Sequence, residues 1–149
     1  MSSKHIDFYF DLSSPYSYLA ATQLDAIANR HGATIAWKPL VLAAVFKAQG
    51  NVMPAVCVPK AQYMVKDLAR WAEHYGVPFQ MSSRFPLPTQ TAARAYYWLH
   101  GQDCALARQF AHAALVELLG EIGHAGVSCE DGVQRVQLPS RIAMASVEP

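Results

Sequence analysis

The stretch "IDFYFDLSSPYSYLA", residues 6–20, decides the fold. Its first part alternates and is rich in aromatic residues, which predicts a strand from Ile6 to Asp11. Its second part begins a series of apolar residues at helical spacing, which predicts a helix from Pro15 to about Arg30. Ser14 suits the N-cap of this helix, and Pro15 suits its first turn because proline has no N–H that would need a partner there.

A second strand is expected soon after this helix. His31 and Gly32 close the helix, and "ATIAWKPLVL", residues 33–42, has the composition of a strand that is interrupted at Pro39. A strand, a helix and a strand over so short a distance imply a right-handed βαβ unit with parallel strands. The fold class is therefore predicted to be α/β.

The rest of the chain is predicted to be mainly helical. Residues 41–59 are expected to be rich in loops, because glycine, asparagine and proline lie close together there. Helices are expected from Lys60 to Tyr75, from a cap at Thr89 or Thr91 to about His100, and from Asp103 to about Ile122. Beyond them the sequence shows no sustained periodicity, and one short strand around residues 133–138 is all that it favours.

Composition excludes several classes of protein. The 149 residues suffice for one compact core, and the net charge of +1 offers no basic patch for nucleic acid. Neither a signal peptide nor a membrane-spanning stretch is recognisable, so we expect a cytoplasmic protein with no membrane partner. The three cysteines and six histidines lack the spacing of a redox pair or of metal ligands, so no metal site is expected.

The junction of strand and helix at Ser14 suits a negative charge, because the first amides of a helix are unpaired and its dipole is positive there. Many redox enzymes place Cys-Pro-X-Cys at such a junction, and its cysteine becomes a stable thiolate. Here Ser14 and Ser17 replace both sulfurs, which excludes disulfide exchange. The hydroxyl of Ser14 can instead donate a hydrogen bond to the thiolate of another molecule. The alternative is that Ser14 only caps the helix.

Four segments, in this order, carry a resemblance to a known family: "IDFYFDLSSPYSYLA", "KPLVLAAVFKAQGN", "KAQYMVKDLARWAEHYGVPF" and "SSRFPLPTQTAARA". Together they resemble the 2-hydroxychromene-2-carboxylate isomerases and kappa-class glutathione transferases, from about Ile6 to about Ala113. The resemblance implies a thioredoxin-like fold that is interrupted by a helical domain and related to bacterial disulfide oxidoreductases. It also implies that the protein binds glutathione as its cofactor and forms a homodimer.

The resemblance assigns roles to three residues. Ser14 matches the catalytic serine that holds the sulfur of glutathione. Asn51 matches an asparagine near the tripeptide and the substrate, and Lys60 matches a lysine that contacts bound glutathione. Without the resemblance, Asn51 would be read as a turn residue beside Gly50 and Lys60 as a solvated lysine at a helix start.

Four further residues are weaker candidates. Ser13 could be a second capping hydroxyl, and Ser17 could lie on the helix surface or in packing. Tyr16 could line the substrate site or belong to the core. Arg84 could fix the connector between helices or meet a carboxylate of the substrate.

The implied reaction is the interconversion of 2-hydroxychromene-2-carboxylate and its ring-opened unsaturated pyruvate form, a step of aromatic catabolism. A glutathione thiolate held at Ser14 adds to the open form, allows bond rotation and is expelled again. A kappa-type transferase would instead conjugate glutathione to another electrophile. A third reading is an inactive fragment that only binds or dimerises.

The family continues beyond its helical domain into a second, ββα half with a cis-proline, and no matching segment follows Ala113 here. We therefore expect a chain that lacks this half, with a tail from about Leu115 that could be read in a shifted frame. The expected division is a βαβ part at residues 1–45, a helical domain at residues 46–122 and an irregular tail at residues 123–149.

Overall fold

A computed structural model of the protein describes residues 4–81 and 85–119. Strand β1, Lys4–Phe10, and strand β2, Ala33–Pro39, form a two-stranded sheet and are joined by helix α1, Pro15–His31. The strands pair in parallel, from Lys4 opposite Ala33 to Phe10 opposite Pro39, so the predicted parallel pairing is confirmed. The predicted second strand ends earlier than expected, at Pro39.

Helix α1 begins and ends where the sequence predicts. Ser14 is its N-cap, and the Ser14 hydroxyl accepts a hydrogen bond from the N–H of Ser17 at 3.3 Å. Pro15 occupies the first turn. Gly32 ends the helix with a φ of +60°, a left-handed conformation that glycine adopts without steric strain.

Four more α-helices follow among the described residues. They are α2, Leu42–Ala48; α3, Val58–Tyr75; α4, Gln90–His100; and α5, Cys104–Leu119. A short 3₁₀ turn, Pro54–Val56, precedes α3. The predicted end of the last helix at residues 120–122 and the predicted strand at residues 133–138 lie outside the described residues.

Helix α2 corrects the expectation of a loop-rich segment at residues 41–59. Its N-cap, Val41, provides no side-chain cap. Instead, the N–H of Leu42 donates a 2.6 Å hydrogen bond to the Asp11 carboxylate, a contact from a distant part of the chain. At the other end, Gly50 has a φ of +63° and the N–H of Asn51 donates to the Phe46 carbonyl. The glycine and asparagine that suggested a loop therefore end a short helix.

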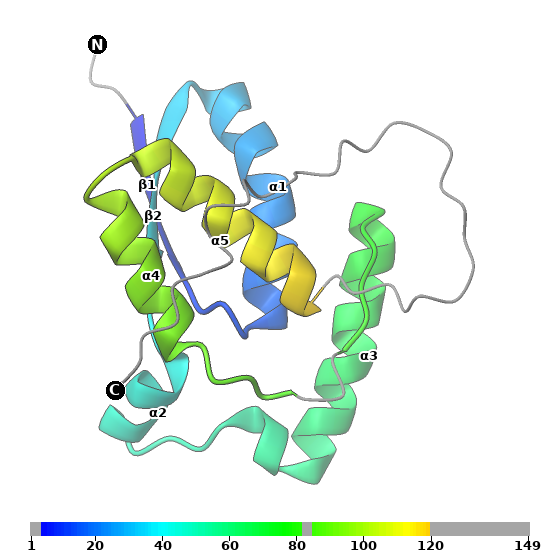
Figure 1. Ribbon diagram of the computed structural model, residues 1–149. Helices are drawn as coiled ribbons and strands as arrows, with labels where there is room; N and C mark the ends of the chain where they lie inside the picture. Colours follow the sequence, from blue (N-terminus) through cyan, green and yellow to red (C-terminus); the bar gives the residue numbers. More distant parts are fainter. Residues whose placement is uncertain (1–3, 82–84, 120–149) are drawn as a thin grey trace.

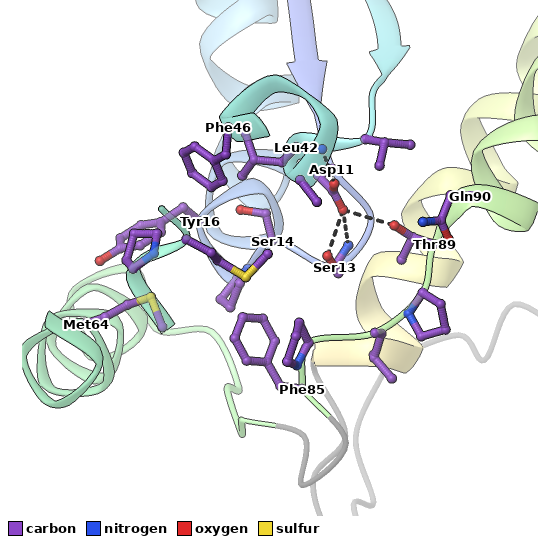
Figure 2. Close-up of a pocket in the computed structure, with 18 residues that line it drawn as sticks. Asp11, Ser13, Ser14, Tyr16, Leu42, Phe46, Met64, Phe85, Thr89 and Gln90 are labelled. Atoms are coloured by element: carbon purple, nitrogen blue, oxygen red, sulfur yellow. Dashed lines mark hydrogen bonds between the residues drawn. The ribbon is translucent and has the colours of Figure 1, made fainter. Parts of the chain in front are cut away.

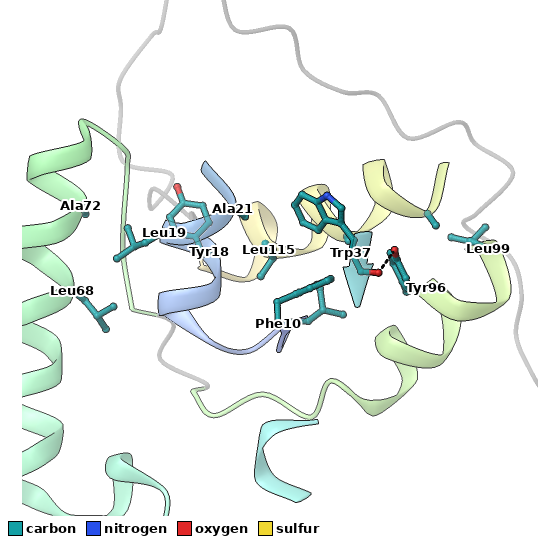
Figure 3. Close-up of a cluster of buried hydrophobic side chains, with 13 residues drawn as sticks. Phe10, Tyr18, Leu19, Ala21, Trp37, Leu68, Ala72, Tyr96, Leu99 and Leu115 are labelled. Atoms are coloured by element: carbon teal, nitrogen blue, oxygen red, sulfur yellow. Dashed lines mark hydrogen bonds between the residues drawn. The ribbon is translucent and has the colours of Figure 1, made fainter. Parts of the chain in front are cut away.

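The helices gather around one side of the sheet (Figure 1). Helix α1 contacts β1, β2, α3 and α5, and α4 contacts α5. The hydrophobic core lies between these elements, with Phe10, Trp37 and Tyr96 packed edge to face at its centre (Figure 3). Among the described residues no helix is long and apolar enough to cross a membrane.

The outer edge of β2 is bound to α4. The hydroxyl of Tyr96 donates to the Trp37 carbonyl, and that of Tyr97 donates to the Pro39 carbonyl, both at 2.8 Å. These contacts join the helical segment to the βαβ unit, and so they hold the end of β2 against the second half of α4.

Candidate functional site

A cavity of about 390 Å³ lies where the two strands end. Asp11 follows β1 and Val41 follows β2, and both line the cavity. Figure 2 shows Ser14 facing the hollow between Phe46, Tyr16 and Phe85. The cavity therefore brings together the start of α1, the start of α2, α3 and the connector that leads to α4.

Ser14 stands at the N-terminus of α1, beside the cavity. It is half-buried and its hydroxyl lines the cavity at the N-terminus of α1, where the helix dipole favours negative charge. The N–H of Ser17 donates to the Ser14 hydroxyl, and the N–H of Tyr18 donates to the Ser14 carbonyl. Because Pro15 has no N–H, the amide of Tyr16 is the remaining donor of the first turn.

Asp11 organises this corner, and sequence reasoning missed it. Its side chain is buried, with 4% exposed, and accepts four hydrogen bonds. The donors are the N–H of Ser13 at 2.7 Å, the Ser13 hydroxyl at 2.8 Å, the Leu42 N–H at 2.6 Å and the Thr89 hydroxyl at 3.2 Å. A carboxylate two residues before Ser13 was the available signal in the sequence.

Tyr16 stands between two cavities. It lines the main cavity and an adjoining one of about 380 Å³, and its hydroxyl donates to Asp67 of α3 at 2.9 Å. Burial and the Asp67 carboxylate raise the pKa of Tyr16 to about 12. Tyr16 is therefore a neutral hydrogen-bond donor at physiological pH. Because Tyr16 is exposed, the alternative that it belongs to the core is wrong, and its place at a substrate site stays a prediction.

Lys60 and Asn51 are placed differently. Lys60 lies in the first turn of α3, is exposed and lines the adjoining cavity together with Tyr16 and Tyr63. Asn51 is exposed and lines neither cavity, and its side-chain oxygen accepts the N–H of Val52 at 2.9 Å. The structure thus brings Lys60 near the Ser14 cavity and leaves Asn51 at the end of α2.

The other three candidate residues also differ in their positions relative to the cavity. Ser13 lines the main cavity, and its hydroxyl donates a hydrogen bond to the Asp11 carboxylate. Ser17 does not line it, and its hydroxyl accepts the N–H of Asp11 at 3.2 Å. Arg84 lies outside the described residues.

The remaining walls are apolar. Phe46, Met53, Met64 and Phe85 lie on four separate segments, which is why periodicity along the sequence did not reveal them. The cavity falls in the size range of small-molecule sites, with apolar walls and a few polar groups at one end. Such an arrangement can hold an apolar body against Ser14 and away from bulk water.

Comparison with known proteins identifies the family. Residues 5–121 match the family described as DSBA-like thioredoxin domain. The chain is 40% identical over 105 residues to a 2-hydroxychromene-2-carboxylate isomerase of Sphingobium xenophagum, across 69% of this chain and 53% of that protein. It is also 40% identical over 74 residues to glutathione S-transferase kappa 1 of Caenorhabditis elegans, across 49% of this chain and 33% of that protein.

A solved structure of a 2-hydroxychromene-2-carboxylate isomerase superposes with a TM-score of 0.68 at 32% sequence identity. The match covers 78% of this chain and 57% of the other. The chain spans about half the length of the isomerases that it matches. These comparisons confirm the expected resemblance and the thioredoxin-like fold class.

Proposed function

Because the chain belongs to the family of DSBA-like thioredoxin domains, we propose that it is a glutathione-dependent isomerase. Its substrate would be 2-hydroxychromene-2-carboxylate or the ring-opened unsaturated pyruvate form of that compound. The observation that carries the proposal is the Ser14 hydroxyl, which lines an apolar cavity at the N-terminus of α1, in a chain whose relatives are named isomerases.

Ser14 is the residue that we expect to act on the sulfur. Its hydroxyl can donate a hydrogen bond to an anionic sulfur, and the nearby helix terminus favours the same charge. Both effects lower the pKa of a thiol bound there. When bound, glutathione supplies a nucleophilic thiolate that adds reversibly to the unsaturated substrate and so permits rotation about a carbon–carbon bond.

Lys60 is the residue that we expect to bind a carboxylate of glutathione. Lys60 lines the cavity that adjoins the Ser14 cavity, and Tyr16 is one of the residues that line both. Asn51 keeps the role that the resemblance gives it, near the tripeptide and the substrate. Its support comes from the resemblance, because Asn51 does not line either cavity among the described residues.

The apolar walls suit the aromatic part of the substrate. Phe46 and Phe85 can pack against a planar ring, and the sulfur atoms of Met53 and Met64 adapt to irregular shapes. By excluding water they strengthen the hydrogen bonds at Ser14. We also propose that the protein is cytoplasmic, as the sequence led us to expect, and, from the resemblance, that it forms a homodimer. Light scattering of the purified chain would check the homodimer.

One observation favours a second function, that of a kappa-type glutathione transferase. The described residues that line the main cavity include no lysine or arginine to pair with a substrate carboxylate. An uncharged electrophile would need no such partner. Product analysis separates the two functions, because an isomerase leaves glutathione unconsumed whereas a transferase converts it into a conjugate.

The first experiment is a calorimetric titration of the purified protein with glutathione, beside Ser14→Ala. We expect the Kd of glutathione to rise roughly tenfold in the variant, because a hydrogen bond to an anion is lost. Thr34→Ala is the control, since it removes an exposed hydroxyl near His5 on the sheet, away from the main cavity. Loss of the Ser14 cap costs about 1 kcal/mol of stability, so circular dichroism must show that the variant is folded during titration.

The outcomes separate clearly. Weaker binding in Ser14→Ala and unchanged binding in Thr34→Ala would support the proposed site and justify assays with the chromene carboxylate. A folded wild-type protein that does not bind glutathione at millimolar concentration would contradict the proposal. Equal binding by wild type and Ser14→Ala would remove Ser14 from the site.

A further inference from the structure

We propose that Asp11 and Thr89 are a pair of positioning residues that hold Ser14 at a fixed place relative to the opposite wall of the cavity. The pair joins the end of β1 to the start of α4, across 78 residues of sequence. Only the purpose of this positioning, which is to hold Ser14 for the binding of glutathione, rests on the proposed function. The contact itself is a property of the fold.

Asp11 holds the turn formed by Ser13 and Ser14, here called the serine turn, through both its side chain and its backbone. Its carboxylate accepts both the N–H and the hydroxyl of Ser13, at 2.7 Å and 2.8 Å. Its backbone carbonyl accepts the N–H of Ser14 at 2.9 Å. The residue that bears the proposed catalytic hydroxyl is therefore bonded directly to Asp11, and so is the residue before it.

The hydroxyl of Thr89 forms a hydrogen bond with this carboxylate and does not cap its own helix. It stands at the N-cap of α4, where a threonine oxygen normally accepts an N–H of the first turn. No side-chain cap is formed, and the hydroxyl donates to Asp11 at 3.2 Å. Thr89 is 5% exposed, so water does not compete freely for this contact. The use of a cap residue in this way indicates that the tertiary contact has its own role.

The contact joins three walls of the cavity (Figure 2). Residues 85–88 line the side opposite Ser14 and lead directly into Thr89. The Leu42 N–H, bonded to the other oxygen of Asp11 at 2.6 Å, brings in the start of α2 and with it Phe46. A buried carboxylate that loses one donor pays a free-energy cost, which a shift toward its remaining donors would reduce. A change at Thr89 should therefore reach Ser13 and Ser14.

Thr89→Val tests the pair, because valine keeps the shape of threonine and removes its hydroxyl. Thr89→Ser restores a hydroxyl and serves as the rescue variant. The matched control is Thr22→Val, which makes the same change in a partly buried threonine of α1 that does not line the main cavity. Should Thr89→Val fail to fold, Thr89→Ala is the second variant without a hydroxyl.

Two measurements decide the outcome. The first is the ¹H–¹⁵N spectrum without ligand, in which the amide signals of Ser13 and Ser14 should shift in Thr89→Val and return in Thr89→Ser. The second is the Kd of glutathione together with the thiolate absorbance of bound glutathione as pH is varied. We expect the Kd to rise roughly threefold to tenfold in Thr89→Val, with a higher pKa for the bound thiol, and to return to within about twofold in Thr89→Ser.

The result that overturns the inference is an unchanged spectrum at Ser13 and Ser14 in Thr89→Val, or the same changes in Thr22→Val. If the wild type does not bind glutathione, the proposed function fails while the amide signals still decide whether Thr89 positions the serine turn. If amide signals shift while binding of glutathione stays unchanged in Thr89→Val, Thr89 positions Ser13 and Ser14 but this positioning does not serve glutathione binding, and that part of the inference is wrong.

Discussion

Tyr16 makes the stability of the folded protein depend on pH. Its pKa of about 12 in the folded protein exceeds the ordinary value of 10.0, because of burial and the Asp67 carboxylate. Between these two pH values the unfolded chain loses the phenolic proton while the folded chain keeps it. The free energy of unfolding should therefore fall as pH rises from 10 to 12, and this contribution is fully present below pH 10. In Tyr16→Phe the fall should be less steep.

Urea denaturation at several pH values from 9 to 11 checks this expectation. Tyr75→Phe is the control, since it changes an exposed tyrosine near the end of α3. An identical pH slope for wild type, Tyr16→Phe and Tyr75→Phe would show that the contact with Asp67 does not hold the proton.

For single residues, the sequence alone predicted the contacts between residues that are close together in the chain. Ser14 caps α1 through Ser17, three residues away, and Pro15 needs no partner. Asp11 could not be assigned in this way, because its donors come from residues 13, 42 and 89. The roles proposed for Ser14, Asn51 and Lys60 stay predictions that the binding experiments must test.

Helix α3 depends on a small buried surface. Of its residues, Leu68 and Ala72 are buried, whereas Val65 and Trp71 are exposed. We expect Leu68→Ala to lower the free energy of unfolding by about 2–5 kcal/mol, the usual cost of emptying a fully buried leucine site. Binding of glutathione should weaken too, because α3 carries Lys60.

Urea denaturation and calorimetry measure both effects. Val65→Ala on the exposed side of the same helix is the control, and its free energy of unfolding should change by less than about 0.5 kcal/mol. If Leu68→Ala behaves like Val65→Ala, the packing of α3 against α1 does not stabilise the protein.

Helix α2 shows why elements are harder to predict when their ends are held by distant residues. It has seven residues, a length at which isolated helices are not stable in water. Its first N–H is held by Asp11, and this tertiary contact cannot be read from residues 41–59. In contrast, α1 and α3 are long and end at glycines with positive φ. The periodicity of their apolar residues and the glycines at their ends therefore predicted the same helices.

At the scale of the whole molecule, one core joins the βαβ unit and the helices. The buried cluster takes side chains from both strands, from α1 and from α3, α4 and α5. Its larger members include Phe10, Leu19, Trp37, Leu68, Tyr96 and Leu115. The division at residue 45 that we proposed from the sequence therefore separates segments that share this core, and the division remains a proposal about function and ancestry.

A shared core predicts that the described part of the chain unfolds in one cooperative step. The variant Trp71→Phe/Trp98→Phe removes the two exposed tryptophans and leaves Trp37, which is buried on β2, as the fluorescent reporter. Far-ultraviolet circular dichroism reports mainly on the helices. We expect the two signals to give the same urea midpoint, because loss of the helices exposes the core around Trp37. If the helical signal is lost at lower urea than the Trp37 signal, the helical segment unfolds by itself, and the contacts of Tyr96 and Tyr97 with β2 do not make the two parts one unit.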